Sequence, residues 1–396
     1  MNRTTIGIVL NGVTGRMGYR QHLVRSLLAI REQGGLPLRD GSRLWPEPVL
    51  VGRDPDKLRE IAERHGLTEW TTDLAAAMAR PDVEIYFDAQ VTSARVKALR
   101  MAIEAGKHIY TEKPIAPDLA GAVELAEQAD AAGIKHGVVQ DKLFLPGLRK
   151  LDRLVKSGFF GRILSIRGEF GYWVFEGDWQ QAQRPSWNYR AADGGGITID
   201  MFPHWHYVLE QIFGPVTAVT ARVMTHVDRR WDERGESYEA TADDAAYGIF
   251  DIAGPDSPII AVINSSWAVR VNRDELVEFQ VDGTLGSAVA GLHHCRIQPR
   301  AATPKPVWNP DLPTPERFRD QWQEVPDNDE FDNGFKAQWE LFLRHVVEDT
   351  PYTWDLWAGA RGVQIAELGL RSSREGRRLD VPELGPSEPR GSELGR

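Results

Sequence analysis

An acid and a histidine lie four residues apart directly after a run of three glycines. The glycines are Gly194–Gly196, and the pair is Asp200 and His204 in a short apolar segment. If this segment is helical, residues four apart lie on one face, one turn from each other. Histidine titrates close to neutral pH, and a nearby carboxylate can orient its ring and stabilise its cation. The spacing therefore indicates proton chemistry, although the same pattern also occurs as an ordinary contact within a helix.

A second group of glycines follows the first apolar run of the chain. The turn reads G-x-x-G-x-x-G from Gly12 to Gly18, between a strand expected at Thr5–Leu10 and a helix expected from about Gly15 to Arg31. Glycines let the backbone turn tightly and approach a pyrophosphate, which then lies at the N-terminus of the following helix. We therefore expect a dinucleotide here, although the motif departs from G-x-G-x-x-G. The residues expected to contact it are Gly12, Thr14, Gly15, Arg16 and Met17.

The end of the second strand bears on the choice of cofactor. Gly52, Arg53 and Asp54 follow the apolar run Val49–Val51. An NAD site usually has an acid here that accepts hydrogen bonds from the ribose hydroxyls. Arg53 can instead stack on adenine and pair with a 2′-phosphate, whereas Asp54 suits the N-cap of a helix expected at Pro55–His65. The sequence thus favours NADP over NAD, with a contact from Asp54 to the ribose as the alternative.

Strands and helices alternate through the first third of the chain. Short apolar runs alternate with segments of helical apolar spacing, which predicts a parallel, doubly wound sheet. The residues from Gly34 to Pro48 are rich in Gly, Pro and charge and predict an inserted loop. Further strands are expected at Ile85–Phe87, His108–Tyr110 and His136–Val139, and further helices at Ser93–Ala105 and Ala120–Ala132.

The pattern changes after Pro146. Longer runs with fewer intervening helices predict a mostly antiparallel sheet, with strands at Ile163–Phe170, Val216–Met224, Ala245–Asp251, Ile259–Ser266, Glu275–Asp282 and Gly286–Ala290. Helices are expected at Asn333–Val347 and Leu356–Ser372. The expected domains are a dinucleotide-binding domain at 1–145, an α/β domain with an open sheet at 146–383, and a disordered tail at 384–396.

Charge and cysteine content exclude several classes of function. The 396 residues carry a formal net charge of −10, which argues against general binding to nucleic acid or acidic membranes. The single cysteine, Cys295, excludes an intramolecular disulfide and a cysteine metal cluster, as is usual in a reducing cytosol. The first residues leave no room for a signal peptide, and no apolar run is long enough to span a membrane. We therefore expect a cytoplasmic protein.

Tryptophan is unusually abundant. The chain has 13, and several of them cluster between Trp173 and Trp205, including Trp179 and Trp187. One interpretation is packing in cores and interfaces. The other is an aromatic wall for a sugar ring, whose C–H faces stack on indole.

A further motif connects these features. Ala105–Pro114 reads A-G-K-H-I-Y-T-E-K-P and resembles the signature of the Gfo/Idh/MocA oxidoreductase family. The segment G-G-x-x-x-D-x-x-x-H that ends at His204 resembles the family's second motif. The likeness extends over nearly the whole chain. It implies a Rossmann domain joined to an open-faced α/β domain, with the substrate bound between them. It also implies NAD(P)-dependent hydride transfer on a sugar, cyclitol or related polyol.

The resemblance also implies residue roles. Lys113 would contact the reacting hydroxyl and the nicotinamide ribose, with Glu112 beside it among the cofactor contacts. Asp200 would orient the site or share its proton, and His204 would be the general acid/base. These roles are chemically consistent, because oxidising a carbinol needs a base for the hydroxyl proton and a cation near the developing alkoxide.

Three positions depart from the family pattern or allow a second interpretation. Gln90 opens a segment, Gln90–Thr92, where the family often has T-P-N, so its cofactor contact must differ. Lys142 stands where the family often has arginine, and it either faces the substrate or is a solvated charge. His206 forms a possible metal pair with His204, but residues two apart on a helix point in different directions, so no metal is expected.

The leading hypothesis is therefore a dehydrogenase that acts on a sugar, glycoside or cyclitol hydroxyl. A glycosidase of the same fold that uses NAD transiently is the alternative, and a regulatory protein that senses the cofactor is a more remote one. An open sheet face exposes apolar area that a partner would cover, so we expect a homodimer or homotetramer through that sheet.

Overall fold

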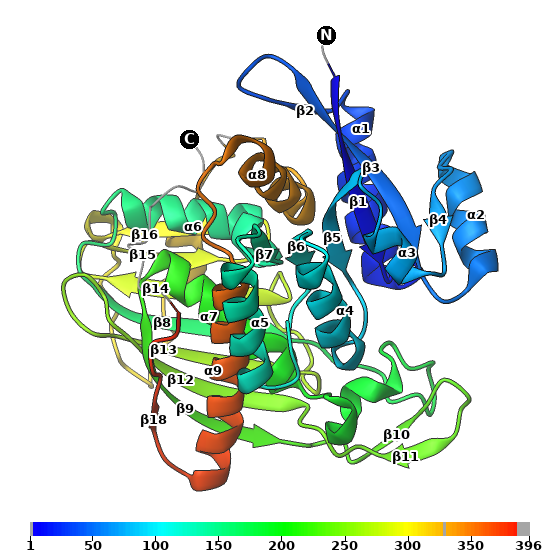
Figure 1. The fold of residues 1–396 in the computed structure, drawn as a ribbon. Coiled ribbons are helices and arrows are strands. Elements are labelled where there is room, and N and C mark those ends of the chain that lie inside the picture. Colours follow the sequence, from blue (N-terminus) through cyan, green and yellow to red (C-terminus); the bar gives the residue numbers. More distant parts are fainter. Residues whose placement is uncertain (1–2, 328–329, 386–396) are drawn as a thin grey trace. The chain divides into compact units, whose positions relative to one another are not determined.

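The computed structural model describes residues 3–327 and 330–385. The chain divides into two compact units, which are described separately (Figure 1). The first unit consists of Met1–Phe144, Asp332–Gln364 and Glu383–Arg396, and the second of Leu145–Phe331 and Ile365–Pro382. Residues 386–396 of the tail expected from the sequence lie outside the described residues.

The first unit contains a seven-stranded sheet of order β2-β3-β1-β5-β6-β7, in which β4 also pairs with β3. All pairs are parallel except β2 with β3. This confirms the doubly wound, mostly parallel sheet predicted from the alternation of apolar runs. The strands are β1 (Arg3–Asn11), β2 (Leu36–Pro37), β3 (Arg43–Val51), β4 (Trp70–Thr71), β5 (Val83–Asp88), β6 (His108–Thr111) and β7 (His136–Val138).

The loop predicted from Gly34 to Pro48 is wrong at two places, because β2 occupies Leu36–Pro37 and β3 already begins at Arg43. This strand pairs with β1 along its whole length, from Arg43 opposite Arg3 to Val51 opposite Asn11. Pro46 and Pro48 misled the prediction. Their backbone nitrogens face the same side of the strand as that of Leu50, because the three residues are spaced two apart. The N–H of Leu50 donates to the carbonyl of Glu69, on the side away from β1. Proline lacks an N–H and is tolerated where that side of the strand needs no donor, so both prolines fit between the short pairings with β2 and β4.

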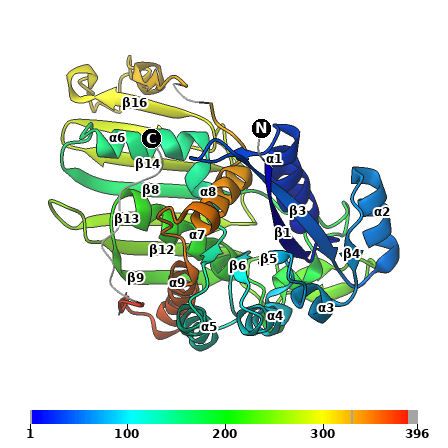
Figure 2. The ribbon, with the colours of Figure 1, turned by 45° about the horizontal axis from the view of Figure 1, so that its top comes forward.

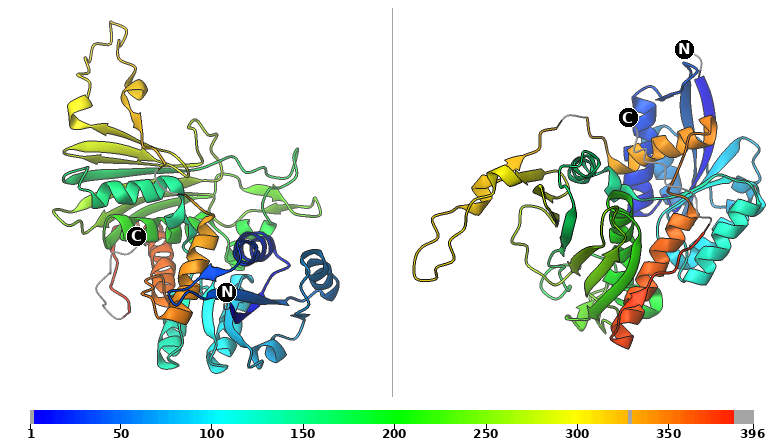
Figure 3. Two further views of the ribbon diagram at one scale, coloured as in Figure 1. Left: turned by 90° about the horizontal axis from the view of Figure 1, so that it is seen from above. Right: turned by 90° about the vertical axis from the view of Figure 1, so that its left-hand side faces the viewer.

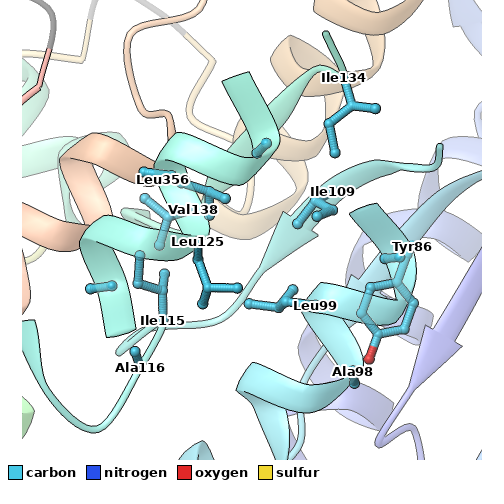
Figure 4. Packing of buried hydrophobic residues seen from close by; sticks show 14 of the residues in the cluster. Tyr86, Ala98, Leu99, Ile109, Ile115, Ala116, Leu125, Ile134, Val138 and Leu356 are labelled. Atoms are coloured by element: carbon cyan, nitrogen blue, oxygen red, sulfur yellow. The ribbon is translucent and has the colours of Figure 1, made fainter. Parts of the chain in front are cut away.

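Helices pack against this sheet and close its core. They are the π-type helix η1 (Met17–Leu28), α1 (Ala29–Glu32), α2 (Pro55–His65), α3 (Leu74–Met78), α4 (Thr92–Glu104), α5 (Leu119–Ala131), the 3₁₀ turn η2 (Asp141–Phe144) and α8 (Gly334–Glu348). Figure 4 shows part of the core, where Leu99 of α4, Leu125 of α5 and Ile109 of β6 are fully buried. Leu356, the first residue of α9 (Leu356–Glu375), belongs to the same cluster.

The second unit contains a nine-stranded sheet of order β17-β16-β15-β14-β8-β13-β12-β9-β18. Only the β13–β8 pair is parallel, which confirms the mostly antiparallel sheet predicted after Pro146. Its strands are β8 (Ile163–Gly171), β9 (Val216–Met224), β12 (Ala245–Ile252), β13 (Ile259–Ser266), β14 (Val277–Gly283), β15 (Gly286–Ala290), β16 (Cys295–Pro299), β17 (Gln323–Glu324) and β18 (Leu379–Asp380).

Two helices, α6 (Pro146–Lys156) and α7 (Ile197–Ile212), lie along this sheet (Figure 2). Inward side chains such as Phe250 and Ile263 are fully buried, whereas their neighbours Ile249 and Val262 are exposed. This alternation leaves the opposite face of the sheet open. A small hairpin, β10 (Arg229–Trp231) with β11 (Ser237–Glu239), and the short 3₁₀ turns η3 (Ser186–Tyr189), η4 (Ala191–Asp193), η5 (Arg300–Ala302) and η6 (Phe318–Gln321) complete the unit.

None of the helices in the described part of the chain is long and apolar enough to cross a membrane.

Candidate active site

The glycine turn connects β1 to η1 in the first unit. Gly12 has a φ of 84°, and its N–H donates to the carbonyl of Val51 at the end of β3 (3.1 Å). A Cβ on Gly18 would lie 2.5 Å from the carbonyl oxygen of Gly12. Only glycine therefore fits where the helix passes the turn. Thr14, Gly15 and Arg16 are exposed there and Met17 is half-buried, so this backbone is open to a ligand.

Arg53 and Asp54, at the end of β3, have different surroundings. Arg53 is exposed. The Asp54 carboxylate accepts hydrogen bonds from the backbone N–H groups of Asp56 (3.1 Å) and Lys57 (3.2 Å), so it caps α2 as the sequence predicts.

A buried ion pair holds the turn that contains Gln90. Asp88, fully buried at the end of β5, accepts from Nε of Arg95 on α4 (3.0 Å) and from both nitrogens of Gln90 (2.9 Å each). The Arg95 guanidinium also donates to the carbonyl of Gln90 (2.6 Å) and to that of Pro114. One side chain therefore joins the segment after β5 to the segment after β6.

Glu112 is buried beside Lys113 and bonds to His22 of η1. The distance from its Oε1 to Nε2 of His22 is 2.9 Å, and its Oε2 accepts from the backbone N–H of Lys113 (3.2 Å). The indole of Trp339 donates to Nδ1 of His22 (3.0 Å), so His22 carries its proton on Nε2 and donates to Glu112. Burial raises the pKa of Glu112, but the hydrogen bond from His22 and the charges of Lys113 and Arg95 outweigh it and hold that pKa below its usual value. Glu112 thus carries a negative charge that fixes the backbone at Lys113, which is itself half-buried.

In the second unit, two glycines shape the approach to α7. A Cβ on Gly195 would lie 2.4 Å from the carbonyl oxygen of Trp187, and one on Gly196 would lie 2.5 Å from the carboxylate of Asp243. Asp243 accepts from the N–H (2.8 Å) and the hydroxyl (2.6 Å) of Thr198. It therefore satisfies donors in the first turn of the helix that carries Asp200 and His204, as a capping residue would.

Asp200 forms an ion pair with Arg184. The distance from its Oδ2 to the guanidinium is 2.8 Å, and both side chains are about one-quarter exposed, at 26% and 22%. The guanidinium lies 4.1 Å above the ring of Trp267. Burial lowers the pKa of Arg184, but the Asp200 carboxylate raises it above its usual value, so the arginine stays charged. This pair keeps a carboxylate partly open to solvent on the first turns of α7.

His204 is buried and bonds to Tyr207. Its Nδ1 lies 2.6 Å from the Tyr207 hydroxyl, so the tyrosine engages one of the two ring nitrogens. His206 has its Nδ1 3.9 Å from Glu210. Within residues 3–327 and 330–385, no three His, Cys, Asp or Glu side chains are placed to hold a metal ion.

The aromatic and lysine candidates for substrate contact lie in several places. Trp179 and Trp187 are 64% and 42% exposed in the segment before α7. Trp173 is half-buried, with the guanidinium of Arg270 4.2 Å from its ring. Lys142 belongs to the first unit, where it forms an ion pair with Asp141 (2.5 Å).

Sequence reasoning missed Arg95, Arg184, His22 and Tyr207. For Tyr207 a signal was available, since it follows His204 by three residues on a helix. Arg184 precedes Asp200 by 16 residues in an irregular segment, and His22 precedes Glu112 by 90, so no local spacing marks either contact.

Two protein-family models and a characterised relative match this chain. The family model "Oxidoreductase family, NAD-binding Rossmann fold" matches residues 29–139, and that of the GFO/IDH/MocA C-terminal domain matches residues 148–289. The chain is 62% identical to a D-xylose dehydrogenase of Paenarthrobacter nicotinovorans over 386 residues, which cover 97% of this chain and 100% of the relative.

Solved structures show the same fold at low identity. A levoglucosan dehydrogenase in complex with NADH and levoglucosan has a TM-score of 0.77 at 20% identity, covering 96% of this chain and 100% of that one. An NAD-binding oxidoreductase from Klebsiella pneumoniae has a TM-score of 0.78 at 20% identity, with the same coverage.

Proposed function

We propose that this chain, which belongs to the Gfo/Idh/MocA family of NAD-binding oxidoreductases, is a dehydrogenase of D-xylose or a closely similar sugar. The chain is an oxidoreductase that acts on CH–OH groups. The observation that carries the sugar assignment is its 62% identity to a D-xylose dehydrogenase along essentially the whole of both chains. The same relative favours a dehydrogenase over a glycosidase or a regulatory protein.

The residues after β1 fit a dinucleotide. The exposed turn from Thr14 to Arg16, with Gly12 and Gly18 too crowded for a Cβ, is a cradle that backbone N–H groups can present to a pyrophosphate. Met17, Gln90, Glu112 and Lys113 are the further residues that we assign to the cofactor side. When bound, the nicotinamide supplies the hydride acceptor, and the protein supplies binding and orientation.

We assign NADP as the preferred cofactor. Arg53 is exposed after β3, while the Asp54 carboxylate is used to cap α2. An arginine here matches a 2′-phosphate. Since the levoglucosan dehydrogenase was solved with NADH, the test must compare both cofactors.

Lys113, Asp200 and His204 carry the proton chemistry in this proposal. The Lys113 ammonium stabilises the developing alkoxide, and Nε2 of His204 accepts the hydroxyl proton. Asp200, which is ion-paired with Arg184, orients the site or shares its proton. Lys142, Trp173, Trp179 and Trp187 are assigned to the sugar, with indole faces that can stack on its C–H surface.

The remaining assignments concern the chain as a whole. Residues 1–145 form the dinucleotide-binding domain and 146–383 the domain for substrate binding and oligomerisation. The protein acts in the cytoplasm as a homodimer or homotetramer through the open sheet.

The test is turnover on a panel of sugars, glycosides and cyclitols, with NAD and NADP assayed separately by absorbance. We expect D-xylose among the good substrates, with net accumulation of reduced cofactor. A glycosidase would instead regenerate its cofactor in every cycle and release a free sugar. Turnover by Lys113→Ala and His204→Ala should fall at least about 100-fold while both bind cofactor. The exposed Lys97→Ala and His293→Ala are matched controls. Full turnover by both active-site variants would refute the assignment.

A further inference from the structure

Arg184 lies in the segment that connects β8 to α7, and it is held from two sides. This segment, residues 172–196, contains the short turns η3 and η4 and is drawn in green in Figure 3. The Arg184 guanidinium donates to Oδ2 of Asp200 (2.8 Å) and lies over the Trp267 ring, 4.1 Å from its centre. Arginine side chains are long and flexible, so this support places the donors of Arg184 in defined directions before a ligand binds.

Trp267 belongs to a buried group of side chains that supports Arg184. Its ring meets the ring of Tyr189 edge to face, with the ring centres 5.4 Å apart. On Tyr189 lies the guanidinium of Arg230, 3.9 Å from the ring centre, and this arginine pairs with the buried Asp244 (3.5 Å). We call four of these side chains the arginine–aromatic stack: Arg184, Trp267, Tyr189 and Arg230. Three of the four are fully buried, so Arg184 rests on closely packed, rigid groups.

The protein uses few of the hydrogen-bond donors of Arg184. A guanidinium has five N–H donors, and among the described residues Asp200 is the only hydrogen-bond partner of this one. The Arg184 side chain is 22% exposed, so a ligand that enters from solvent can reach it. In the same stack, Tyr189 Oη and Trp267 Nε1 are buried and have no hydrogen-bond partner in the described part of the chain. Buried polar atoms are rarely left unsatisfied, so this combination indicates a site for a polar molecule.

The pair of Arg184 and Asp200 suits a neutral hydroxyl better than an anion. Arginine commonly binds carboxylates and phosphates, but the Asp200 carboxylate already balances its charge here and would repel a second anion. A hydroxyl can accept from the guanidinium and donate to the carboxylate at once, because a carboxylate offers about four acceptor positions. The exposed Trp179 and Trp187 lie in the same segment as Arg184. Aromatic side chains together with a few fixed polar groups are typical of small-molecule sites, and indole faces suit a sugar.

We propose that Arg184 is a specificity-determining residue that donates to one hydroxyl of a neutral sugar, other than the hydroxyl that is oxidised. This inference rests on the proposed function, in which α7 carries the substrate-side residues Asp200 and His204. Arg184 recognises the sugar without taking part in the proton transfer, so its loss weakens binding more than it slows turnover. A sugar that lacks this hydroxyl leaves the guanidinium without its partner and is rejected for that reason.

The first experiment is a double-mutant cycle between the residue and the sugar. D-xylose and deoxy analogues that each lack one of its hydroxyls are assayed with the wild type and with Arg184→Met. For D-xylose, the variant should raise KM at least about tenfold and change kcat less than about threefold. For one analogue, the two proteins should have the same KM, because the hydroxyl that Arg184 binds is already missing. If the variant raises KM by the same factor for every sugar, Arg184 contacts no hydroxyl and the proposal is wrong.

A second variant, Arg184→Lys, separates recognition of the sugar from charge balance. Lysine keeps a positive charge beside Asp200 but lacks the flat fork of donors. The variant should therefore melt close to the wild type, while its KM for D-xylose stays closer to that of Arg184→Met than to that of the wild type. Full recovery of KM by lysine would show that Arg184 only balances the charge of Asp200. The matched control is Arg296→Met, which removes an arginine paired with Glu324 (3.1 Å) on β16 and should leave KM unchanged.

Binding of D-xylose is also measured without turnover, by titration calorimetry in the presence of reduced cofactor, which cannot accept a hydride. We expect the dissociation constant of D-xylose to rise at least about tenfold in Arg184→Met. If the wild type oxidises D-xylose and the variant binds it equally well, the proposal fails and the dehydrogenase assignment stands. If D-xylose binds through Arg184 but no cofactor is ever reduced, the dehydrogenase assignment fails and the site stands. A wild type that binds no D-xylose would overturn the proposal.

Discussion

At the scale of single residues, the hydroxyl of Tyr207 determines how the ring of His204 is held. A tyrosine hydroxyl both donates and accepts, so it can satisfy Nδ1 of His204 whether or not that nitrogen is protonated. For His204 to accept a proton at Nε2, Nδ1–H must donate to Tyr207. Tyr207→Phe removes this hydrogen bond to Nδ1.

We therefore expect Tyr207→Phe to lower kcat about tenfold or more, with the affinity for cofactor unchanged. Steady-state kinetics and cofactor titration measure the two quantities separately. A kcat equal to that of the wild type would show that the tyrosine only packs against the histidine.

Glu112 supplies a pH-dependent contribution to stability. Burial raises the pKa of its carboxyl, but the hydrogen bond from His22 and the nearby cations lower it further, so the net shift is below the usual value of about 4.5. A lowered pKa means that the folded state favours the ionised carboxylate. The contribution is therefore fully present above about pH 4.5 and is lost as the pH falls through the lower pKa of the folded state.

The melting temperature of the wild type should accordingly fall as the pH drops below about 4.5. Glu112→Gln should be less stable than the wild type at pH 7, with a smaller difference in acid. Glu127→Gln, on the exposed face of α5, should show no such pH dependence. If the loss of stability in Glu112→Gln were the same at every pH, the role assigned to the charge would be wrong.

At the scale of elements, Arg95 of α4 joins two loops that we assign to the cofactor. It bonds to Asp88, to the carbonyl of Gln90 and to that of Pro114. Removing one partner of a buried ion pair leaves the other charge uncompensated, which costs about 3–5 kcal/mol. The Arg95→Met protein should therefore unfold at a lower denaturant concentration than the wild type. It should also bind cofactor at least about tenfold more weakly.

The double variant Arg95→Met, Asp88→Asn separates charge from loop position. It should recover part of the stability, because no unpaired charge remains buried, but not the cofactor affinity. Recovery of both would mean that Arg95 does not position the loops. Denaturant curves and cofactor titration provide the two readouts.

The elements also show what a sequence can and cannot predict. Buried parallel strands such as β1 and β5 are continuous apolar runs, and α2 carries its own cap and proline, so these elements were predictable from local signals. Residues 43–48 of strand β3 were not, because the prolines among them are tolerated only at the gap between β2 and β4, a property of the sheet. The two motifs that contain Lys113 and Asp200 were visible in the sequence. The partners His22 and Arg184 were not visible in the sequence, because only the folded chain brings them to Glu112 and Asp200.

At the scale of the whole molecule, cofactor binding should stabilise the folded chain in proportion to affinity. A ligand at 100 times its dissociation constant adds about 2.7 kcal/mol. If Arg53 pairs with a 2′-phosphate, NADP should raise the melting temperature more than NAD at equal concentration. Arg53→Ala should weaken NADP binding about tenfold, the loss of roughly 1.4 kcal/mol, and leave NAD binding nearly unchanged. The exposed Arg162→Ala, in the second unit, is the matched control. If Arg53→Ala affects the two cofactors equally, the arginine does not read the phosphate, and the preference for NADP is wrong even though the chain remains a dehydrogenase.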